Sequence, residues 1–295
     1  MTDLAGAVAA AADRLAAAGV PSPGPDARWL VAAAAGEDPR RRPTAALTPE
    51  AAARLAPMLA RRAAREPLQL VVGSTAFRAL ELTCAPGVFV PRPETEVLAG
   101  LAVVAASAVV AARGAALVVE PCCGTGAVAL AVASEVADVR VVAADVDPSA
   151  AALAAVNRDA VDGLLRAPVE VRTGDLLEVL GPEEHGRVDV LVVNPPYLPA
   201  ADLPTLPPEV AEHDPHRALF GGPDGHEVVD RLLAAAPDVL APGGTVLLEV
   251  DARRGADAVA AATAAGLIDV RLAPDLAGVP RFLVAHRPGP EGPRG

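Results

Sequence analysis

The chain has 295 residues and a net charge of −12, with a pI near 4.9. So acidic a chain has no general attraction for a phosphate backbone, which disfavours non-specific nucleic-acid binding. The length suits two domains, or one large one, with a sizeable core. Apolar residues make up 52% of the chain but aromatic residues only 2%, so the core must consist of small aliphatic side chains.

Three cysteines, Cys84, Cys122 and Cys123, make no disulfide framework and lack the paired spacing of a zinc site. We therefore expect a reduced, cytoplasmic protein. The start of the chain carries Asp3 and no basic stretch, which argues against a signal peptide. The longest apolar run, residues 97–112, is shorter than the roughly 20 residues of a membrane span and predicts a buried helix instead.

The first part of the chain is Ala-rich, with apolar residues at helical spacing. This pattern predicts helices over residues 3–18, 25–35 and 49–63, separated by Pro and Gly, with Thr48 capping the third. We expect residues 1–66 to form a small helical bundle. Residues 67–92 are expected to form a linker and a β-hairpin.

From residue 93 to residue 287, strand and helix patterns alternate, which predicts an α/β domain with a mostly parallel, doubly wound sheet. The Pro- and Gly-rich tail, residues 288–295, is expected to be disordered. The predicted strands are 116–120, 139–144, 169–172, 188–193, 245–250, 267–272 and 281–285. The predicted helices are one from about residue 94, then 126–137, 148–160, 225–240 and 254–265.

Ligands of such sheets bind beyond the carboxyl ends of the strands. The first strand ends in Glu120-Pro-Cys122-Cys-Gly124-Thr-Gly126, where two glycines allow a tight turn and a close approach to the backbone. The following helix would point its positive end at an anion. Ala129 takes the third glycine position of a dinucleotide motif, which disfavours a dehydrogenase. A plain strand-to-helix turn explains the two glycines about as well.

Acidic residues follow the next two strands. Asp145 ends the second strand at a spacing typical of an acid that binds a ribose diol, while Asp147 before Pro148 suits a helix cap. Asp175 follows the third strand, where a carboxylate can accept a hydrogen bond from an exocyclic amine such as adenine N6. Taken singly, Asp145 and Asp175 also fit a cap and a turn, but acids at consecutive strand ends favour a cofactor site.

The fourth strand ends in Asn194-Pro195-Pro196-Tyr197, which contains the only Tyr of the chain. These motifs, in this order, resemble a class I S-adenosylmethionine-dependent methyltransferase. Further segments extend the resemblance to the HemK/PrmC protein-(glutamine-N5) methyltransferases, over residues 65–287: Arg65-Glu-Pro-Leu-Gln69, Val90-Pro-Arg-Pro-Glu-Thr-Glu96 and Asp214-Pro-His-Arg-Ala-Leu-Phe-Gly-Gly222. The resemblance implies a Rossmann-like seven-stranded sheet with a reversed last strand and a small helical N-terminal domain that helps to hold a protein substrate.

The resemblance also implies a reaction and its participants. The expected reaction is methyl transfer from S-adenosylmethionine to the side-chain amide nitrogen of a glutamine, in the Gly-Gly-Gln motif of a peptide chain release factor. A cofactor site is expected from Glu120, Cys122, Gly124, Gly126, Asp145, Asp175, Asn194, Thr95 and Phe89, with Arg92 on the substrate side. The family usually has Gly-Thr in place of Cys122-Cys123, which we interpret as a neutral packing change or as the mark of a paralogue with another protein substrate.

The Asn-Pro-Pro-Tyr tetrapeptide suits this chemistry. An amide NH₂ carries two hydrogens, which the side-chain oxygen of Asn194 and the backbone carbonyl of Pro195 can accept. Pro195 and Pro196 bring no competing N–H and hold their predecessors extended, while Tyr197 offers a flat wall. The alternative for the tetrapeptide alone is a strand-to-loop turn.

Two other functions compete with methyl transfer to a protein glutamine. The runner-up is adenine N6 methylation in nucleic acid, which uses a similar tetrapeptide but conflicts with the acidic charge and the few aromatic residues. A cofactor-binding protein without chemistry conflicts with the intact tetrapeptide. We expect no metal, because the sulfonium methyl is already activated and because His213, His216 and His226 fit no common metal spacing. We favour a monomer without membrane or nucleic-acid partners.

Overall fold

The computed structural model describes residues 2–289, so residues 290–295 of the predicted tail lie outside the described part. The chain divides into two compact units. The first comprises Met1–Ser74, Cys84–Pro86 and Leu206–His213, and the second comprises Thr75–Thr83, Gly87–Thr205 and Asp214–Gly295.

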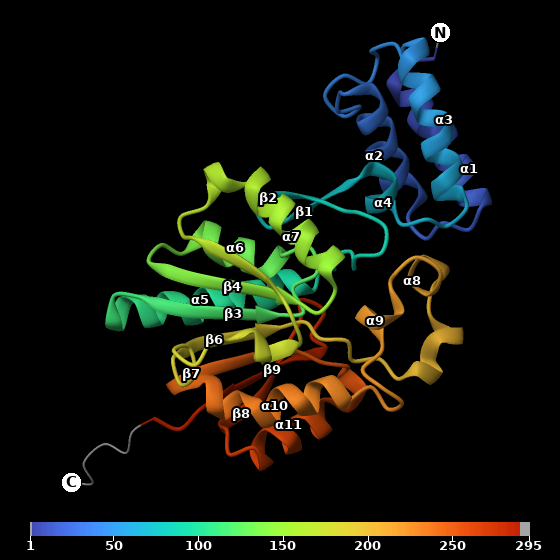
Figure 1. The fold of residues 1–295 in the computed structure, drawn as a ribbon. Coiled ribbons are helices and arrows are strands. Elements are labelled where there is room, and N and C mark those ends of the chain that lie inside the picture. Colours follow the sequence, from blue (N-terminus) through green and yellow to red (C-terminus); the bar gives the residue numbers. More distant parts are fainter. Residues whose placement is uncertain (1, 290–295) are drawn as a thin grey trace. The chain divides into compact units, whose positions relative to one another are not determined.

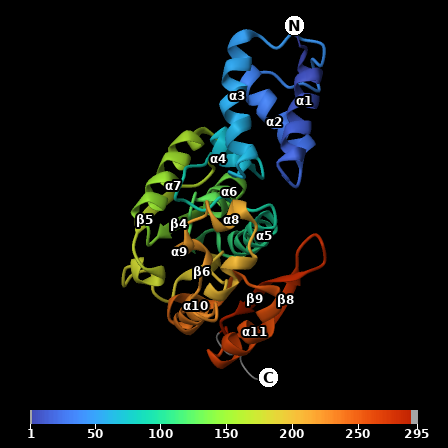
Figure 2. The same cartoon turned by 90° about the vertical axis from the view of Figure 1, so that its right-hand side faces the viewer.

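Helices build the first unit, as predicted. They are α1 (Leu4–Ala17), α2 (Pro23–Ala35), α3 (Pro49–Ala63), α4 (Leu68–Val72) and the short α8 (Pro208–Ala211). Helices α1, α2 and α3 pack side by side around a small aliphatic core that includes Leu15 and Leu30 (Figure 2). The Thr48 side chain accepts a hydrogen bond from the backbone N–H of Ala51 at 3.1 Å, which confirms the predicted cap.

A buried ion cluster lies within this unit. The side chain of Arg62 is 6% exposed and pairs with Asp26 at 2.7 Å and with Glu209 of α8 at 3.0 Å. Arg65 also pairs with Glu209, at 2.7 Å. Burial opposes ionisation of Glu209, but hydrogen bonds from the two arginines prevail and lower its pKa to about 2. The cluster therefore ties α8, far along the chain, to α2 and α3.

The second unit contains a seven-stranded sheet with the order β5-β4-β3-β6-β7-β9-β8. Strands β3 to β7 run parallel, and β9 pairs antiparallel with both β7 and β8, which confirms the reversed last strand. The bounds are β3 (Ala116–Pro121), β4 (Val139–Asp145), β5 (Val169–Thr173), β6 (Val188–Val193), β7 (Leu240–Glu249), β8 (Ile268–Pro274) and β9 (Pro280–His286).

Helices cover both faces of the sheet (Figure 1). Helices α5 (Thr95–Arg113), α6 (Ala127–Glu135) and α7 (Pro148–Ala160) share one apolar core with the sheet, while α10 (Glu227–Val239) and α11 (Gly255–Ala264) share the other. The remaining short elements are α9 (His216–Leu219), η1 (Asp162–Leu164), η2 (Leu176–Val179), η3 (Ala200–Thr205) and η4 (Ala252–Arg254). A separate hairpin is formed by β1 (Ser74–Phe77) and β2 (Leu80–Thr83).

Helix α5 contains the apolar run 97–112 and is a helix of the core, as predicted. Its buried face consists of Leu98, Ala99, Ala102 and Ala106, while Val104 on the opposite face is 69% exposed. By length and composition alone, α5 is the one helix within residues 2–289 that could cross a membrane. Its buried stripe packs against β3, β6 and β7 as a helix of the α/β core.

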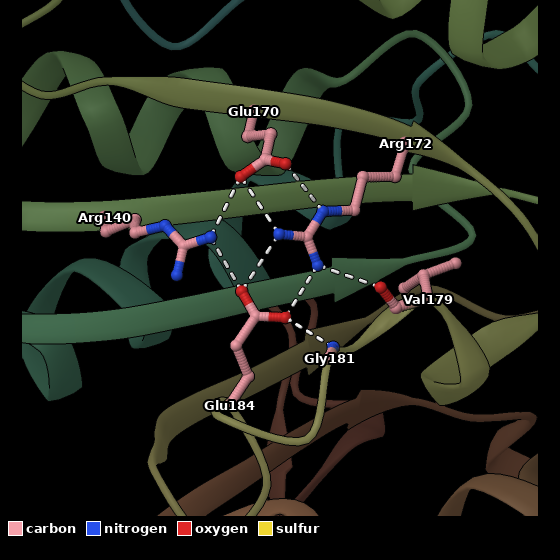
Figure 3. Close-up of polar contacts among 6 residues, drawn as sticks. All are labelled: Arg140, Glu170, Arg172, Val179, Gly181 and Glu184. Atoms are coloured by element: carbon pink, nitrogen blue, oxygen red, sulfur yellow. Dashed lines mark hydrogen bonds and ion pairs between the residues drawn. The ribbon is translucent and has the colours of Figure 1, made fainter.

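An ion network covers the edge of the sheet at β5. Glu184, in the loop after η2, pairs with Arg140 of β4 and with Arg172 of β5, both at 2.7 Å (Figure 3). Glu170 completes the network by pairing with the same two arginines. These ion pairs fix the loop to β4 and β5. Arg172 adds a hydrogen bond to the carbonyl of Val179.

Candidate active site

The parallel strands end at one level, which brings the predicted site segments together. Thr173 of β5 pairs with Asp145 of β4, Ala144 pairs with Pro121 of β3, and Val193 of β6 pairs with Leu248 of β7. The residues that follow these ends are Gly174 and Asp175, Val146, Cys122 and Asn194, and β7 itself ends at Glu249. Asn194 therefore leaves the sheet on the strand next to the glycine-containing turn, with Asp145 one strand further on.

The turn between β3 and α6 is tight and buried. Gly124 and Gly126 have φ angles of +55° and +79°, in the left-handed region that favours glycine. A side chain at Gly126 would come within 3.2 Å of the Ala154 methyl group. The buried side-chain amide of Asn157, on α7, donates to the carbonyl of Thr125 at 3.0 Å and so stabilises the turn.

Glu120 has a structural partner. Its carboxylate accepts a hydrogen bond from the backbone N–H of Ala129 at 2.7 Å, in the first turn of α6. Burial, and to a smaller extent the negative charge of Asp145, raise the pKa of Glu120 to about 8, although this hydrogen bond acts to lower it. Glu120 thus braces the start of α6 against β3, and its expected cofactor contact stays a prediction.

Asp145 organises the same turn. Its two carboxylate oxygens accept from the backbone N–H groups of Gly124 and Asp147, each at 2.9 Å. Asp147 in turn caps α7 by accepting from the Ser149 N–H, as the sequence predicted. Burial raises the pKa of Asp145 despite these hydrogen bonds. Asp175 is more open and pairs with Arg231 of α10 at 2.6 Å.

Cys122 occupies a backbone position that favours glycine. Its φ of +63° lies in the left-handed region, where a residue with a Cβ is strained by about 1 kcal/mol. A glycine would adopt this conformation without that strain, and the interpretation of Cys122-Cys123 as a packing change or as the mark of a paralogue stays a hypothesis. Burial and the carboxylates of Asp145 and Glu120 raise the pKa of both Cys122 and Cys123, which keeps the two thiols protonated.

The Asn-Pro-Pro-Tyr segment is held by side chains of two other elements. The amide nitrogen of Asn194 donates to the hydroxyl of Thr95, at the start of α5, at 3.3 Å. Thr95 donates to Glu249 at the end of β7, at 2.9 Å. The Tyr197 hydroxyl donates to the other oxygen of Glu249 at 3.2 Å. Thr95 was expected to face the cofactor, and here its hydroxyl links Asn194 to Glu249.

A second segment supports the tetrapeptide through its backbone. Leu198 forms a bridge with Phe220, and the Gly221 N–H donates to the Leu198 carbonyl at 3.1 Å. A Cβ at Gly221 would lie 2.5 Å from the Pro196 carbonyl oxygen, and one at Gly225 would lie 2.4 Å from that of Tyr197. Only glycine allows so close an approach, which gives a physical role to the end of the 214–222 motif.

Phe89 and Arg92 lie together on the segment before α5. The Arg92 guanidinium stands 4.7 Å from the centre of the Phe89 ring and forms an ion pair with the buried Asp214. The carbonyl of Phe89 would be 3.9 Å from a Cβ at Gly124, so this segment runs beside the glycine turn. Arg217 pairs with Asp147 at 3.3 Å. Within residues 2–289, no group of three acidic, Cys or His side chains is arranged to hold a metal ion.

Sequence reasoning missed Glu249, Asn157 and Gly225. Glu249 is another acid at a strand end, so the pattern that singled out Asp145 and Asp175 would also have found it. Asn157 and Gly225 carried no signal, because their partners Thr125 and Tyr197 are remote in the sequence.

The sheet order, the reversed strand and the helices on both faces define a class I methyltransferase fold. A methyltransferase from Pyrococcus furiosus has a similar crystal structure, with a TM-score of 0.51 and 20% identity over 72% of this chain and 91% of that one. Two family models match, a PrmC N-terminal domain over residues 6–73 and a methyltransferase small domain over residues 82–204.

Curated relatives are similar over almost the whole chain. The release factor glutamine methyltransferase of Mycolicibacterium smegmatis is 43% identical over 97% of this chain and 99% of its own length. That of Streptomyces coelicolor is 40% identical over 95% of this chain and 96% of its own. The chain belongs to the release factor glutamine methyltransferase family.

Proposed function

We propose that this protein transfers a methyl group from S-adenosylmethionine to the side-chain amide nitrogen of a glutamine in a peptide chain release factor. One observation carries the proposal: Asn194-Pro-Pro-Tyr197 leaves the sheet at the end of β6, next to the glycine turn that follows β3. A polar tetrapeptide that suits a planar amide thus lies beside a turn that suits a charged cofactor. The names of the full-length relatives support the same substrate.

The residues around the glycine turn fit the cofactor. Gly124 and Gly126 leave the backbone open to close approach, and Asp145 and Asp175 add carboxylates at successive strand ends. Asp145 would accept from the ribose hydroxyls and Asp175 from the adenine amine. Glu120, Cys122, Phe89, Thr95 and Asn194 complete the proposed site. When bound, S-adenosylmethionine supplies a methyl group that is already activated on a sulfonium sulfur.

The tetrapeptide would orient the amide that accepts this methyl group. An amide nitrogen is a poor nucleophile, because its lone pair is delocalised into the carbonyl. Asn194 donates through its amide nitrogen to Thr95, so its side-chain oxygen is the atom available to accept from a substrate NH₂. The Pro195 carbonyl would accept the second hydrogen, and Tyr197 and Pro196 would border the amide plane. Such positioning lowers a barrier by up to about 7–11 kcal/mol in favourable cases.

Charge also contributes to the proposed step. As the nitrogen would bond to the methyl group, the bond from that methyl to sulfur would break, leaving S-adenosylhomocysteine, and the nitrogen would lose one proton to give the N-methyl amide. Positive charge grows on the amide hydrogens before the proton leaves, and two oxygen acceptors stabilise this charge better than they stabilise the neutral amide. Arg92 would lie on the substrate side, where its ion pair with Asp214 fixes the guanidinium over Phe89.

The test uses the full chain with labelled S-adenosylmethionine and either a release factor or an oligonucleotide. We expect label on the glutamine of the Gly-Gly-Gln motif, located by mass spectrometry of the digested product. Label on adenine would overturn the proposal in favour of the nucleic-acid alternative. Label on another protein, with none on the release factor, would assign a different substrate to the same chemistry. We further propose that the enzyme acts in the cytoplasm as a monomer.

A further inference from the structure

Glu249 lies directly behind the tetrapeptide. Its neighbour Leu248 pairs with Val193, which places Glu249 across from Asn194 at the ends of β7 and β6. The residue is 2% exposed and accepts two hydrogen bonds, from Thr95 at 2.9 Å and from Tyr197 at 3.2 Å. Burying a carboxylate is costly because it loses its hydration. An apolar residue would fill the same space without this cost, so a carboxylate beside Asn194 indicates more than a packing role.

The chain of hydrogen bonds has a direction. A hydroxyl group has a single hydrogen, and Thr95 gives this hydrogen to Glu249. The oxygen of Thr95 can then only accept, and it accepts from the amide nitrogen of Asn194 at 3.3 Å. The nitrogen side of the Asn194 amide therefore faces Thr95, and its oxygen side is turned away from Thr95.

We propose that Glu249 is a positioning residue for methyl transfer, which, as an acceptor-only carboxylate, sets the direction of the Asn194–Thr95–Glu249 chain and anchors the Tyr197 hydroxyl. The inference rests on the proposed function, because the Asn194 oxygen is the group that holds the substrate amide there. Glu249 is buried and binds Thr95 and Tyr197, so its proposed role acts through Thr95, Asn194 and Tyr197.

Neutralising Glu249 removes this direction. Thr95 and Tyr197 bind different oxygens of Glu249, and a glutamine in the same orientation has an NH₂ donor in place of one of them, so one of the two hydroxyl groups loses its acceptor. If its NH₂ group donates to Thr95, the Thr95 hydroxyl is free to donate to Asn194. The Asn194 amide then turns over, and its oxygen is bound to Thr95 instead of facing the substrate.

The test compares the wild-type protein with Glu249→Gln, using a release factor and labelled S-adenosylmethionine. We expect kcat to fall about 30-fold, with the cofactor Kd and the melting temperature close to those of the wild type. Thr95→Val should lower kcat to a similar extent, Thr95→Ser should restore most of it, and the Thr95→Val/Glu249→Gln double variant should lose little more than either single variant. The matched control is Glu94→Gln, which removes an exposed charge near Glu249 without a bond to Thr95 or Tyr197.

A pH profile separates positioning from mere packing. Burial raises the pKa of Glu249, and the negative charge of Glu94 raises it further. The hydrogen bonds from Thr95 and Tyr197 and the positive charge of Arg281 act in the opposite direction. A protonated Glu249 can donate to Thr95, so wild-type kcat should fall as the pH drops through this pKa. This acid limb should be absent in Glu249→Gln.

The outcomes separate the inference from the proposed function. A wild-type protein that methylates a release factor, with Glu249→Gln and Thr95→Val both within threefold of its kcat, would overturn the role of Glu249. A wild-type protein without activity on release factor would instead overturn the proposed function. In that case the side-chain amide NMR signals of Asn194, assigned by their loss in Asn194→Ala, decide the inference. We expect Glu249→Gln to shift them, and unchanged signals would refute it.

Discussion

Thr95 and Glu249 are 154 residues apart in the sequence and are joined by a 2.9 Å hydrogen bond within the protein core. This bond connects the start of α5 to the end of β7 and, through the Thr95 oxygen, reaches Asn194 at the end of β6. These two bonds thus join three elements that are far apart in the sequence, at the point where the substrate amide is proposed to bind.

Asn194→Ala should abolish methyl transfer. The change removes the oxygen acceptor, and we expect kcat to fall by at least about 100-fold, as when a single preorganised polar group is deleted from an active site. Cofactor binding should survive, because the glycine turn and Asp145 are untouched. Labelled methyl transfer and calorimetric titration of the cofactor measure the two effects. Near-normal turnover would contradict the proposed role of Asn194.

Asn194→Asp serves as the companion variant. It keeps an acceptor but loses the NH₂ group that donates to Thr95. We expect an intermediate kcat, since the acceptor remains while its direction is no longer fixed. Turnover as low as that of Asn194→Ala would show that the donor side of the amide matters as much as the acceptor side.

Gly225→Ala should displace the tetrapeptide at the backbone of Tyr197. Gly225 has a φ of +84°, and a Cβ there would lie 2.4 Å from the Tyr197 carbonyl oxygen. Gly266 is a matched control, because its φ is +81° and a Cβ there would meet nothing within 4 Å. Both variants bear the cost of left-handed geometry, about 1 kcal/mol, but only Gly225→Ala must also shift the backbone.

The two glycine variants should therefore differ in activity as well as in stability. We expect Gly266→Ala to keep wild-type kcat, and Gly225→Ala to lose about tenfold or more through displacement of Tyr197. Urea unfolding and methyl-transfer assays provide the comparison. Equal kcat values for the two variants would show that the contact with Tyr197 has no effect on the site.

Much of the fold could be predicted because strands β3 to β6 are short aliphatic runs with polar ends. The predicted strand 188–193 is β6 without change, and the helix 148–160 is α7. Strand β7 was predicted to begin at residue 245 but begins at Leu240, before Pro242-Gly-Gly244. The pairing with β6 shifts register between Val188 and Val190, and such an irregularity leaves no periodic signal.

The candidate site was predictable in its residues but not in its bonds. Asn194, Asp145 and Gly124 stood out because each follows or ends a strand, and parallel strands bring their ends together. The partners Thr95 and Glu249 could not be paired from sequence, because a long-range hydrogen bond depends on the register of three elements. Cys122 shows the same limit, since its left-handed backbone appears only in the folded turn.

Glu184→Gln should destabilise the edge of the sheet. The Glu184 side chain is 2% exposed, and its loss would leave Arg140 and Arg172 partly unpaired (Figure 3). We expect the free energy of unfolding to fall by about 2 kcal/mol. Glu170→Gln is the matched control, because Glu170 binds the same two arginines with a side chain that is 49% exposed, so its removal should cost less than about 1 kcal/mol. Equal losses in urea unfolding would contradict the role of burial.

The stability that Glu184 contributes should depend on pH. Hydrogen bonding from Arg172 outweighs burial and lowers the pKa of Glu184 to about 2, below the roughly 4.3 of an unfolded glutamate. A depressed pKa gives stability that is present above the unfolded value and is lost as the pH falls towards the folded one. The stability difference between the wild type and Glu184→Gln should therefore shrink from about pH 5 downwards. A constant difference to pH 3 would be inconsistent with an ionised Glu184.

The thiols of Cys122 and Cys123 should be inert in the folded protein. Burial raises the pKa of both, with further contributions from the carboxylates of Glu120 and Asp145. Since only the thiolate is reactive, alkylation by iodoacetamide at pH 8 should be at least about tenfold slower in the folded protein than in urea. Mass spectrometry of the digested protein resolves the two sites. Fast modification of Cys122 in the folded state would show that the glycine turn opens.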